Sequence, residues 1–454
     1  MSVAPAFGTA DRTAVAAIRR VAIRLTGGPD DYDALLEQIG DARLVLLGES
    51  SHGTNEFYRE RARITQRLIE ECGFSAVAIE GDWPDAYRVH RYVSGDDRDG
   101  DAEEALRGFR RFPAWMWRNA AVVDLVGWLR DHNDRRPPGT PAAGFFGLDL
   151  YSLHASMAAV IAHLDRVDRD AAARARQRYA CLQPFAGERG PEYGRAVLQG
   201  VSEPCRQAVI EELVELRREA GRRLTLDGVV AEDDEFCAER NATVVANAEE
   251  YYRTMFGDRA GSWNLRDRHM ADTLDHLVAH LGRRRDPAKV VVWAHNSHVG
   301  DARATEAASR GELTLGQLAR ERHGADAVLV GFTTYAGTVT AASDWDAPAE
   351  RKRVRAALPG SSEQLLHETG LPAFLLARLR DSGGGAALHA PRLHRAIGVI
   401  YRPETERQSH NLQASTSRQF DALVHIDHTR AVEPLERTAA WDRGAPPETY
   451  PTAL

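Results

Sequence analysis

The stretch Leu44-Val-Leu-Leu-Gly-Glu-Ser-Ser-His-Gly-Thr-Asn-Glu56 contains the features that decide the fold. Its first four residues are all apolar, which is typical of a short strand buried on both faces of a parallel sheet. A glycine ends this run, and a polar loop with Glu49 and His52 follows before a helix begins near Thr54. A carboxylate and an imidazole are therefore predicted at the strand-to-helix edge, where open α/β sheets bind their ligands.

The helix after this loop carries an arginine where an apolar residue is expected. Apolar residues at three- and four-residue spacing between Phe57 and Leu68 define a buried face, and Arg61 falls in its middle. A buried guanidinium is costly unless it meets an acid, so we expect Arg61 to pair with Glu49 or Glu80. The alternative is an arginine that extends past the edge of the core into solvent.

Several separated motifs resemble those of the erythromycin esterase family. They are Gly48-Glu-Ser-Ser-His-Gly-Thr-Asn-Glu56, Ala78-Ile-Glu-Gly81, Phe112-Pro-Ala-Trp-Met-Trp-Arg118, Arg266-Asp-Arg-His-Met270, Trp293-Ala-His-Asn-Ser-His-Val299, Gly331-Phe-Thr-Thr-Tyr-Ala-Gly-Thr-Val-Thr340 and Gln419-Phe-Asp-Ala-Leu-Val-His425. The resemblance covers about residues 40 to 435. It implies one active site with His52 as general base, made by Glu49, His52, Arg61, Glu80, His295 and His298.

The length, charge and cysteine content disfavour several classes of protein. The chain has 454 residues, 43% of them hydrophobic, which is enough for two or three domains or one domain with an insertion. No apolar stretch approaches the ~20 residues of a membrane span, and nothing resembles a secretory signal. The net charge of −8 disfavours nucleic acid as a partner, and four scattered cysteines indicate a reduced, cytoplasmic chain. We expect a small-molecule substrate, with no membrane partner and no prediction of oligomeric state.

Strand and helix patterns alternate except in the middle of the chain. Apolar runs predict strands at 44–47, 76–79, 144–150, 289–293, 327–332, 338–342, 374–377, 396–401 and 422–426. Helical periodicity alone, from about 152 to 285, predicts an insertion of three to five helices. We expect an α/β fold with a mixed, mostly parallel sheet flanked by helices. Residues 1–150 and 286–454 would form this core and carry the active site, and 151–285 an all-helical insertion that covers the cleft.

Four of the predicted strands end in or beside a titratable group. These groups are Glu49, Glu80, Asp149 and His295, and two further histidines, His52 and His298, lie three residues beyond Glu49 and His295. One such strand end could be chance, but four at one edge of a sheet are hard to explain by core packing. The alternative is that the histidines are hydrogen-bonded core or cap residues.

Other residues of these motifs and of the neighbouring loops are expected to contact the substrate. They are Trp83, Trp117, Arg118, Arg266, Asp267 and Tyr335. Apolar residues between Met270 and Leu281 predict the buried face of the last helix of the insertion, with Asp267 one turn back on that face. For Arg266 and Asp267, a salt bridge that closes the insertion onto the core is an equal alternative.

The residue types also restrict the chemistry. No Gly-x-Ser-x-Gly elbow occurs, and the two serines beside His52 are too close in sequence to use it as their base, which disfavours a serine nucleophile. The spacings Glu49-x-x-His52 and His295-x-x-His298 resemble metal-ligand pairs. A guanidinium from Arg61 would repel a divalent cation, however, so we expect neither a metal nor another cofactor.

Direct attack of water on an ester is the remaining mechanism. A neutral His52 takes a proton from water, and Glu80 holds or orients the site. Arg61, or the imidazolium of His295 or His298, stabilises the oxyanion. The resemblance implies a carboxylic ester hydrolase that opens the lactone of a 14-membered macrolide and so confers antibiotic resistance. Two alternatives are hydrolysis of another ester or polysaccharide substituent, and a non-enzymatic protein that binds a small molecule in the same cleft.

Overall fold

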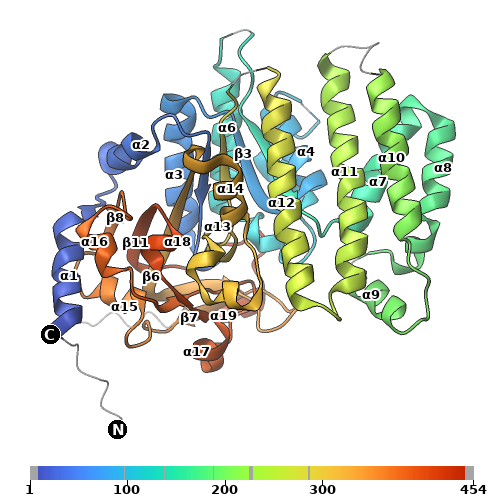
Figure 1. The fold of residues 1–454 in the computed structure, drawn as a ribbon. Helices are drawn as coiled ribbons and strands as arrows, with labels where there is room; N and C mark the ends of the chain where they lie inside the picture. Colours follow the sequence, from blue (N-terminus) through green and yellow to red (C-terminus); the bar gives the residue numbers. More distant parts are fainter. Residues whose placement is uncertain are drawn as a thin grey trace.

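The computed structural model describes residues 9–96, 98–137, 139–187, 189–223, 229–284 and 287–444. Within these ranges one nine-stranded sheet has the order β1 (Ile23–Arg24), β8 (Ala373–Leu376), β11 (Ala422–Thr429), β6 (Ala327–Ala341), β2 (Leu44–Leu47), β5 (Val290–Trp293), β3 (Ala76–Asp82) and β4 (Gly144–Asp149), with β7 (Glu350–Val354) paired to β6. The strands from β11 to β4 are parallel to one another, and β1, β7 and β8 pair antiparallel. The prediction of a mixed, mostly parallel sheet flanked by helices is confirmed (Figure 1).

Helices on both faces of the sheet explain why its central strands are apolar throughout. Val45 and Leu47 of β2 pack toward α2 (Asp33–Ile39), α3 (Asn55–Cys72) and α6 (Ala120–Asp134). The alternate residues Leu44 and Leu46 pack toward α12 (Arg259–Gly282) and α14 (Leu315–His323). Successive side chains of a strand point to opposite faces, so a strand covered on both sides needs an unbroken apolar run.

The middle of the chain forms a helical bundle beside the sheet (Figure 1). It consists of α7 (Leu153–Val167), α8 (Arg169–Tyr179), α9 (Gly190–Leu198), α10 (Arg206–Arg223) and α11 (Val229–Thr254), which enclose an apolar core of their own. With α12, the described residues hold six α-helices here, more than the three to five predicted. The division into two domains stays a prediction, and its boundary at residues 285 and 286 lies outside the described ranges.

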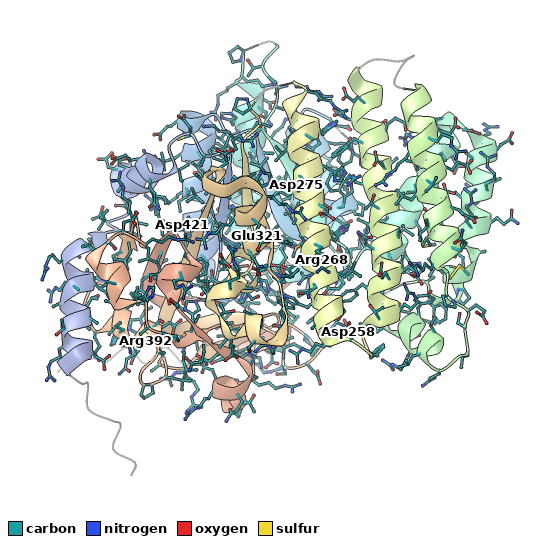
Figure 2. All side chains as sticks on the ribbon, viewed as in Figure 1. Asp258, Arg268, Asp275, Glu321, Arg392 and Asp421 are labelled. Atoms are coloured by element: carbon teal, nitrogen blue, oxygen red, sulfur yellow. A yellow bond between two sulfur atoms is a disulfide. The ribbon has the colours of Figure 1, made fainter. Side chains whose placement is uncertain are left out.

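Helix α12 lies between this bundle and the sheet. Its buried face is the predicted one, with Met270, Leu274 and Leu277 at most 1% exposed, and these side chains belong to the core on the sheet. Asp275 of the same helix accepts hydrogen bonds from Arg322 and His323 of α14; Figure 2 labels Asp275. Helix α12 is therefore packed as part of the core, although it is continuous in sequence with the insertion.

Some predicted elements differ from the structure. The two strands expected at 327–332 and 338–342 are one strand, β6, and the polar segment Glu350–Val354 pairs with it as the edge strand β7. Residues 396–401 form isolated bridges rather than a strand, next to a two-stranded sheet of β9 (Arg392–Arg395) and β10 (Asn411–Ala414). Edge strands need few apolar residues because only one side is paired and solvent reaches them, so apolar runs do not find them.

The structure also bears on the cysteines and on membrane-spanning helices. A disulfide joins Cys181 to Cys205, whose Cα atoms are 6.1 Å apart, so the expectation of four reduced cysteines is wrong for this pair. Cys72 and Cys237 are free. Among the described helices, none is long and apolar enough to cross a membrane.

Candidate active site

Four neighbouring parallel strands bring titratable groups to one edge of the sheet. Along the order β2-β5-β3-β4, Glu49 follows β2, His295 follows β5, Glu80 lies near the end of β3, and Asp149 ends β4. Each of these side chains is buried. The carboxyl ends of parallel strands lie at the same edge of a sheet, so the sheet alone brings these residues together although they are far apart in sequence.

Glu49 is the centre of a buried three-residue chain of hydrogen bonds. Its Oε1 atom lies 3.0 Å from Nδ1 of His52, and its Oε2 atom accepts from Nη2 of Arg61 at 2.6 Å. Arg61 is fully buried and lies over the rings of Tyr58 and Trp293, with its guanidinium carbon 4.8 and 4.6 Å from their centroids. The expected pairing of Arg61 with Glu49 is therefore present, and aromatic faces stabilise the cation.

Close backbone contacts hold the loop that carries His52. The carbonyl oxygen of Gly53 accepts from the backbone N–H groups of Thr340, at 3.0 Å, and Val432, at 2.8 Å. A Cβ atom on Gly53 would lie 1.8 Å from the carbonyl oxygen of Thr340, so only glycine fits. The neighbouring His52 N–H donates to the carbonyl of Ile397. These contacts fix the position from which the His52 ring reaches Glu49.

Arg266 of α12 joins the acids at the ends of β3 and β4. Its Nη2 atom lies 2.7 Å from Oε1 of Glu80 and 2.6 Å from Oδ2 of Asp149. Its Nη1 atom lies 2.9 Å from Nε2 of His298, whose Nδ1 atom lies 2.9 Å from Oδ2 of Asp267. The salt bridge foreseen for Arg266 therefore exists, and it connects the last helix of the insertion to the strand ends.

The charges in this cluster set the ionisation of its members. Burial opposes ionisation of Glu80, but His298, Arg266 and His52 outweigh it and hold the pKa of Glu80 well below its usual range. For Asp149, Arg266 likewise overcomes burial and lowers the pKa. Burial also opposes the charged form of His298, yet Asp267 and Glu80 raise its pKa. Both strand-end acids are therefore ionised at neutral pH.

His295 behaves differently from His298. Burial and then the nearby His52, whose ring centroid is 4.8 Å away, hold the pKa of His295 well below its usual value. Its Nδ1 atom accepts from the backbone N–H of Ser297 at 3.2 Å. The imidazole is therefore neutral, which corrects the expectation that His295 could serve as an imidazolium.

The cluster forms one wall of a cavity of ≈ 300 Å³. Its polar lining includes His52, Glu80, Asp149, Arg266, His295 and His298. The lining also includes five aromatic side chains, Phe109, Trp117, Tyr151, Trp263 and Trp345. A compact cavity with convergent polar groups and shifted ionisation is the usual character of an active site.

Besides Glu49 and Asp267, four predicted residues do not line this cavity. Arg61 lies behind Glu49, so the expectation that it contacts an oxyanion is corrected. Trp83 is 1% exposed and packs between Phe146 and Phe236 in the core. The remaining two are tied elsewhere: Arg118 pairs with Glu436, and the ring of Tyr335 stacks on that of His367 with centroids 3.6 Å apart. Asp267 contacts His298, through the hydrogen bond to its Nδ1 atom, and not the cavity.

Several residues of the cavity wall were not predicted from the sequence. Tyr151, two residues beyond Asp149, lies under both Arg111 and Arg266, whose guanidinium carbons are 4.9 and 4.8 Å from its ring centroid. Trp263 stacks on His298 with centroids 4.6 Å apart. A signal was available for Trp263, because it precedes Arg266 by one helical turn and must share its side of the helix.

The two pairs with metal-like spacing, Glu49 with His52 and His295 with His298, do not form a ligand set. Both oxygens of Glu49 already meet Arg61 and His52, and the ring nitrogens of His298 meet Arg266 and Asp267. Across the described residues, no group of three or more His, Cys, Asp or Glu side chains is arranged to hold a metal ion.

The comparison with known proteins agrees with the motifs. A family model described as erythromycin esterase matches residues 69–429. The chain belongs to the erythromycin esterase family. The resemblance predicted from the sequence is thereby confirmed, and membership of this family indicates a hydrolase. The loop with Glu49 and His52 lies before the matched residues, so the assignment does not depend on it.

Relatives of this erythromycin esterase family member are distant. The type II erythromycin esterase of Escherichia coli is 24% identical over 327 residues, which cover 69% of this chain and 74% of that protein. A solved succinoglycan biosynthesis protein has a TM-score of 0.74 at 23% identity, with 94% of this chain and 99% of that chain covered. A mutant of the erythromycin esterase EreC in its open conformation has a TM-score of 0.62 at 18% identity, over 90% and 95% of the two chains. These structures share the fold.

Proposed function

We propose that this protein hydrolyses an ester by direct attack of water, with His52 as the general base. The observation that carries the proposal is the hydrogen bond of 3.0 Å between Nδ1 of His52 and Oε1 of Glu49. A carboxylate only accepts hydrogen bonds, so Nδ1 carries the proton and the lone pair is on Nε2, on the other side of the ring. His52 lines the cavity, which supports Nε2 as the atom that takes a proton from water.

The proposed reaction adds one water and needs no covalent enzyme intermediate. The water oxygen forms a bond to the ester carbonyl carbon while its proton moves to His52. The tetrahedral intermediate then collapses, the carbon–oxygen bond of the ester breaks, and the protonated His52 gives its proton to the leaving alkoxide. A carboxylic acid and an alcohol result, and His52 returns to its neutral form.

Arg266, rather than Arg61, is the cation proposed to stabilise the oxyanion. It lines the cavity, and its hydrogen bonds to Glu80, Asp149 and His298 fix its orientation before substrate binds. A positive group that needs no reorganisation during the reaction stabilises the negative charge that develops on the carbonyl oxygen. The two acids position Arg266, and neither can donate a proton, because both are ionised at neutral pH.

We propose the lactone of a 14-membered macrolide as the substrate, and loss of the antibiotic's activity as the consequence. Membership of the erythromycin esterase family and the named relative in Escherichia coli support this choice. A small-molecule ester is the only partner in the proposal, without nucleic acid or membrane, and the reaction would occur in the cytoplasm. The alternative of a non-enzymatic binding protein does not require a base at the cavity wall, where His52 lies.

Mass spectrometry of a macrolide panel tests this function. We expect a gain of one water on 14-membered lactones with the wild-type protein and none with buffer alone. The hydrolysed product should be an open-chain hydroxy acid. If no ester in the panel gains water while the protein is folded, the proposed function is wrong.

A further inference from the structure

A second, larger cavity adjoins the catalytic one. Its volume is ≈ 720 Å³, against ≈ 300 Å³ for the catalytic cavity. Both are lined by Asp82, Arg111, Tyr151 and Trp345, so these residues form the border between them. Arg111 is held there by two hydrogen bonds to Asp82, of 2.9 and 3.1 Å. The two cavities therefore share part of their walls.

The lining of the second cavity differs from that of the first. Helices α7 and α11, with the turn after α11, contribute Leu153, Tyr252, Met255 and Phe256, and most of the lining is apolar. Charged groups such as Arg195 lie among these apolar side chains. Such a surface favours a bulky, apolar group and would bind a bare sugar chain poorly.

Exposed aromatic rings are an independent indication that a ligand binds in the second cavity. Within the described residues, Phe256 and Trp345 are the large aromatic side chains with high exposure, at 43% and 52%, and both line the second cavity. Aromatic rings bury 150–250 Å² when covered, so leaving two of them open in one cavity is unfavourable unless a ligand covers them.

We infer that the second cavity binds the larger, non-reacting part of the ester substrate, and that this part is a bulky apolar skeleton. The inference rests on the proposed function and specifies its substrate class. It assigns a specificity role to Phe256, which lines only the second cavity, and to Trp345 at the border. Binding energy from this remote part holds the ester against His52 and raises the effective concentration of the two.

Filling the cavity tests the inference. Ala155 is an exposed residue of α7 in the cavity wall, and Ala155→Trp places an indole there. The matched control is Ala158→Trp, at an exposed position of the same helix outside the wall. For erythromycin, we expect Ala155→Trp to raise KM roughly tenfold with a smaller change in kcat, and Ala158→Trp to leave both unchanged. Hydrolysis of p-nitrophenyl acetate, which fits the catalytic cavity, should be equal in all three proteins.

Removing one apolar side chain from the wall of the second cavity gives a second test. Phe256→Ala should also raise KM for erythromycin, whereas Leu198→Ala, at a residue that is 62% exposed and lies outside the cavity, should not. If erythromycin is hydrolysed and both cavity variants keep the wild-type KM, the inference is overturned while the proposed function stands.

A binding measurement separates the inference from turnover. Anilinonaphthalene sulfonate should fluoresce in the wild-type cavity, less in Ala155→Trp and Phe256→Ala, and erythromycin should displace it. This result would support the second cavity even in a protein with no esterase activity. Equal fluorescence in all variants, or no displacement by erythromycin, would contradict the inference.

Discussion

Arg61, which does not line the cavity, donates to the oxygen of Glu49 that does not meet His52, with Nη2 of Arg61 2.6 Å from Oε2 of Glu49. The side chain of Arg61 is fully buried, and its Nε and Nη1 atoms have no hydrogen-bond partner among the described residues. Arg61 therefore supports Glu49, which in turn holds the ring of His52. It is a positioning residue rather than a group that meets substrate.

Arg61→Met should destabilise the fold strongly. The variant leaves Glu49 buried without its cation, and breaking a buried pair costs about 3–5 kcal/mol. We expect the double variant Glu49→Gln/Arg61→Met to recover part of this loss, because no uncompensated charge remains. Urea unfolding measures the free energy of unfolding of both variants. The control is Arg59→Met, at an exposed position of the same helix. A loss no greater than that of the control would show that the pair does not stabilise the fold.

His52→Asn should remove the base and leave the structure intact. General-base catalysis typically contributes 10²–10⁴-fold, so kcat for the macrolide should fall by about that factor. Binding of the substrate, measured by displacement of anilinonaphthalene sulfonate, should not change. A variant that hydrolyses its substrate at nearly the wild-type rate would mean that His52 is not the base.

Arg266→Met should reduce stability in a pH-dependent way. Arg266 lowers the pKa values of Glu80 and Asp149, so the stability it provides is present above the unfolded pKa values of about 4 and lost as pH falls through the folded ones. We expect the free energies of unfolding of wild type and variant to differ by about 3 kcal/mol or more at pH 7, and this difference to shrink steadily as pH falls below about 4. Arg268→Met is the matched control, at an exposed position of the same helix (Figure 2). A difference that does not shrink in acid would contradict the assignment.

Asp85→Asn should stabilise the protein, and only at higher pH. Burial and then Asp82 raise the pKa of Asp85 to about 7. The folded state therefore favours the protonated form, and stability is lost as pH rises from about 4 to 7. We expect the variant to exceed wild type by about 1–2 kcal/mol at pH 8, because partial exposure reduces the 1.4 kcal/mol per pKa unit. Thermal unfolding should show no difference near pH 4, and a gain that is the same at every pH would refute the explanation.

The strand ends were the most informative part of the sequence. The apolar runs before Glu49, Glu80, Asp149 and His295 predicted buried parallel strands, and this geometry alone brings their ends to one edge. The unusual position of Arg61 on an apolar face likewise predicted a buried ion pair. These inferences depend only on local periodicity and on the cost of burying charge.

Features that depend on side-chain reach could not be predicted in this way. Periodicity places Arg61 near Glu49 but does not determine which side of the carboxylate it occupies. Trp83 begins α4 (Trp83–Val93) directly after β3, where a substrate contact is plausible, yet its ring turns into the core against Phe146. The second cavity involves Tyr252 and Trp345, which are far apart in sequence and belong to no common pattern.

The position of α12 has a consequence for protein engineering. Arg266 and Asp267 are neighbours on this helix, and they hold Glu80 and His298 while the same helix buries Met270 against the sheet. A chimera that takes its substrate-binding helices from a relative should therefore exchange the segment only up to the end of α11. A junction placed after α12 would import a foreign arginine and aspartate into the ionic cluster, so the hybrid would change its chemistry together with its specificity.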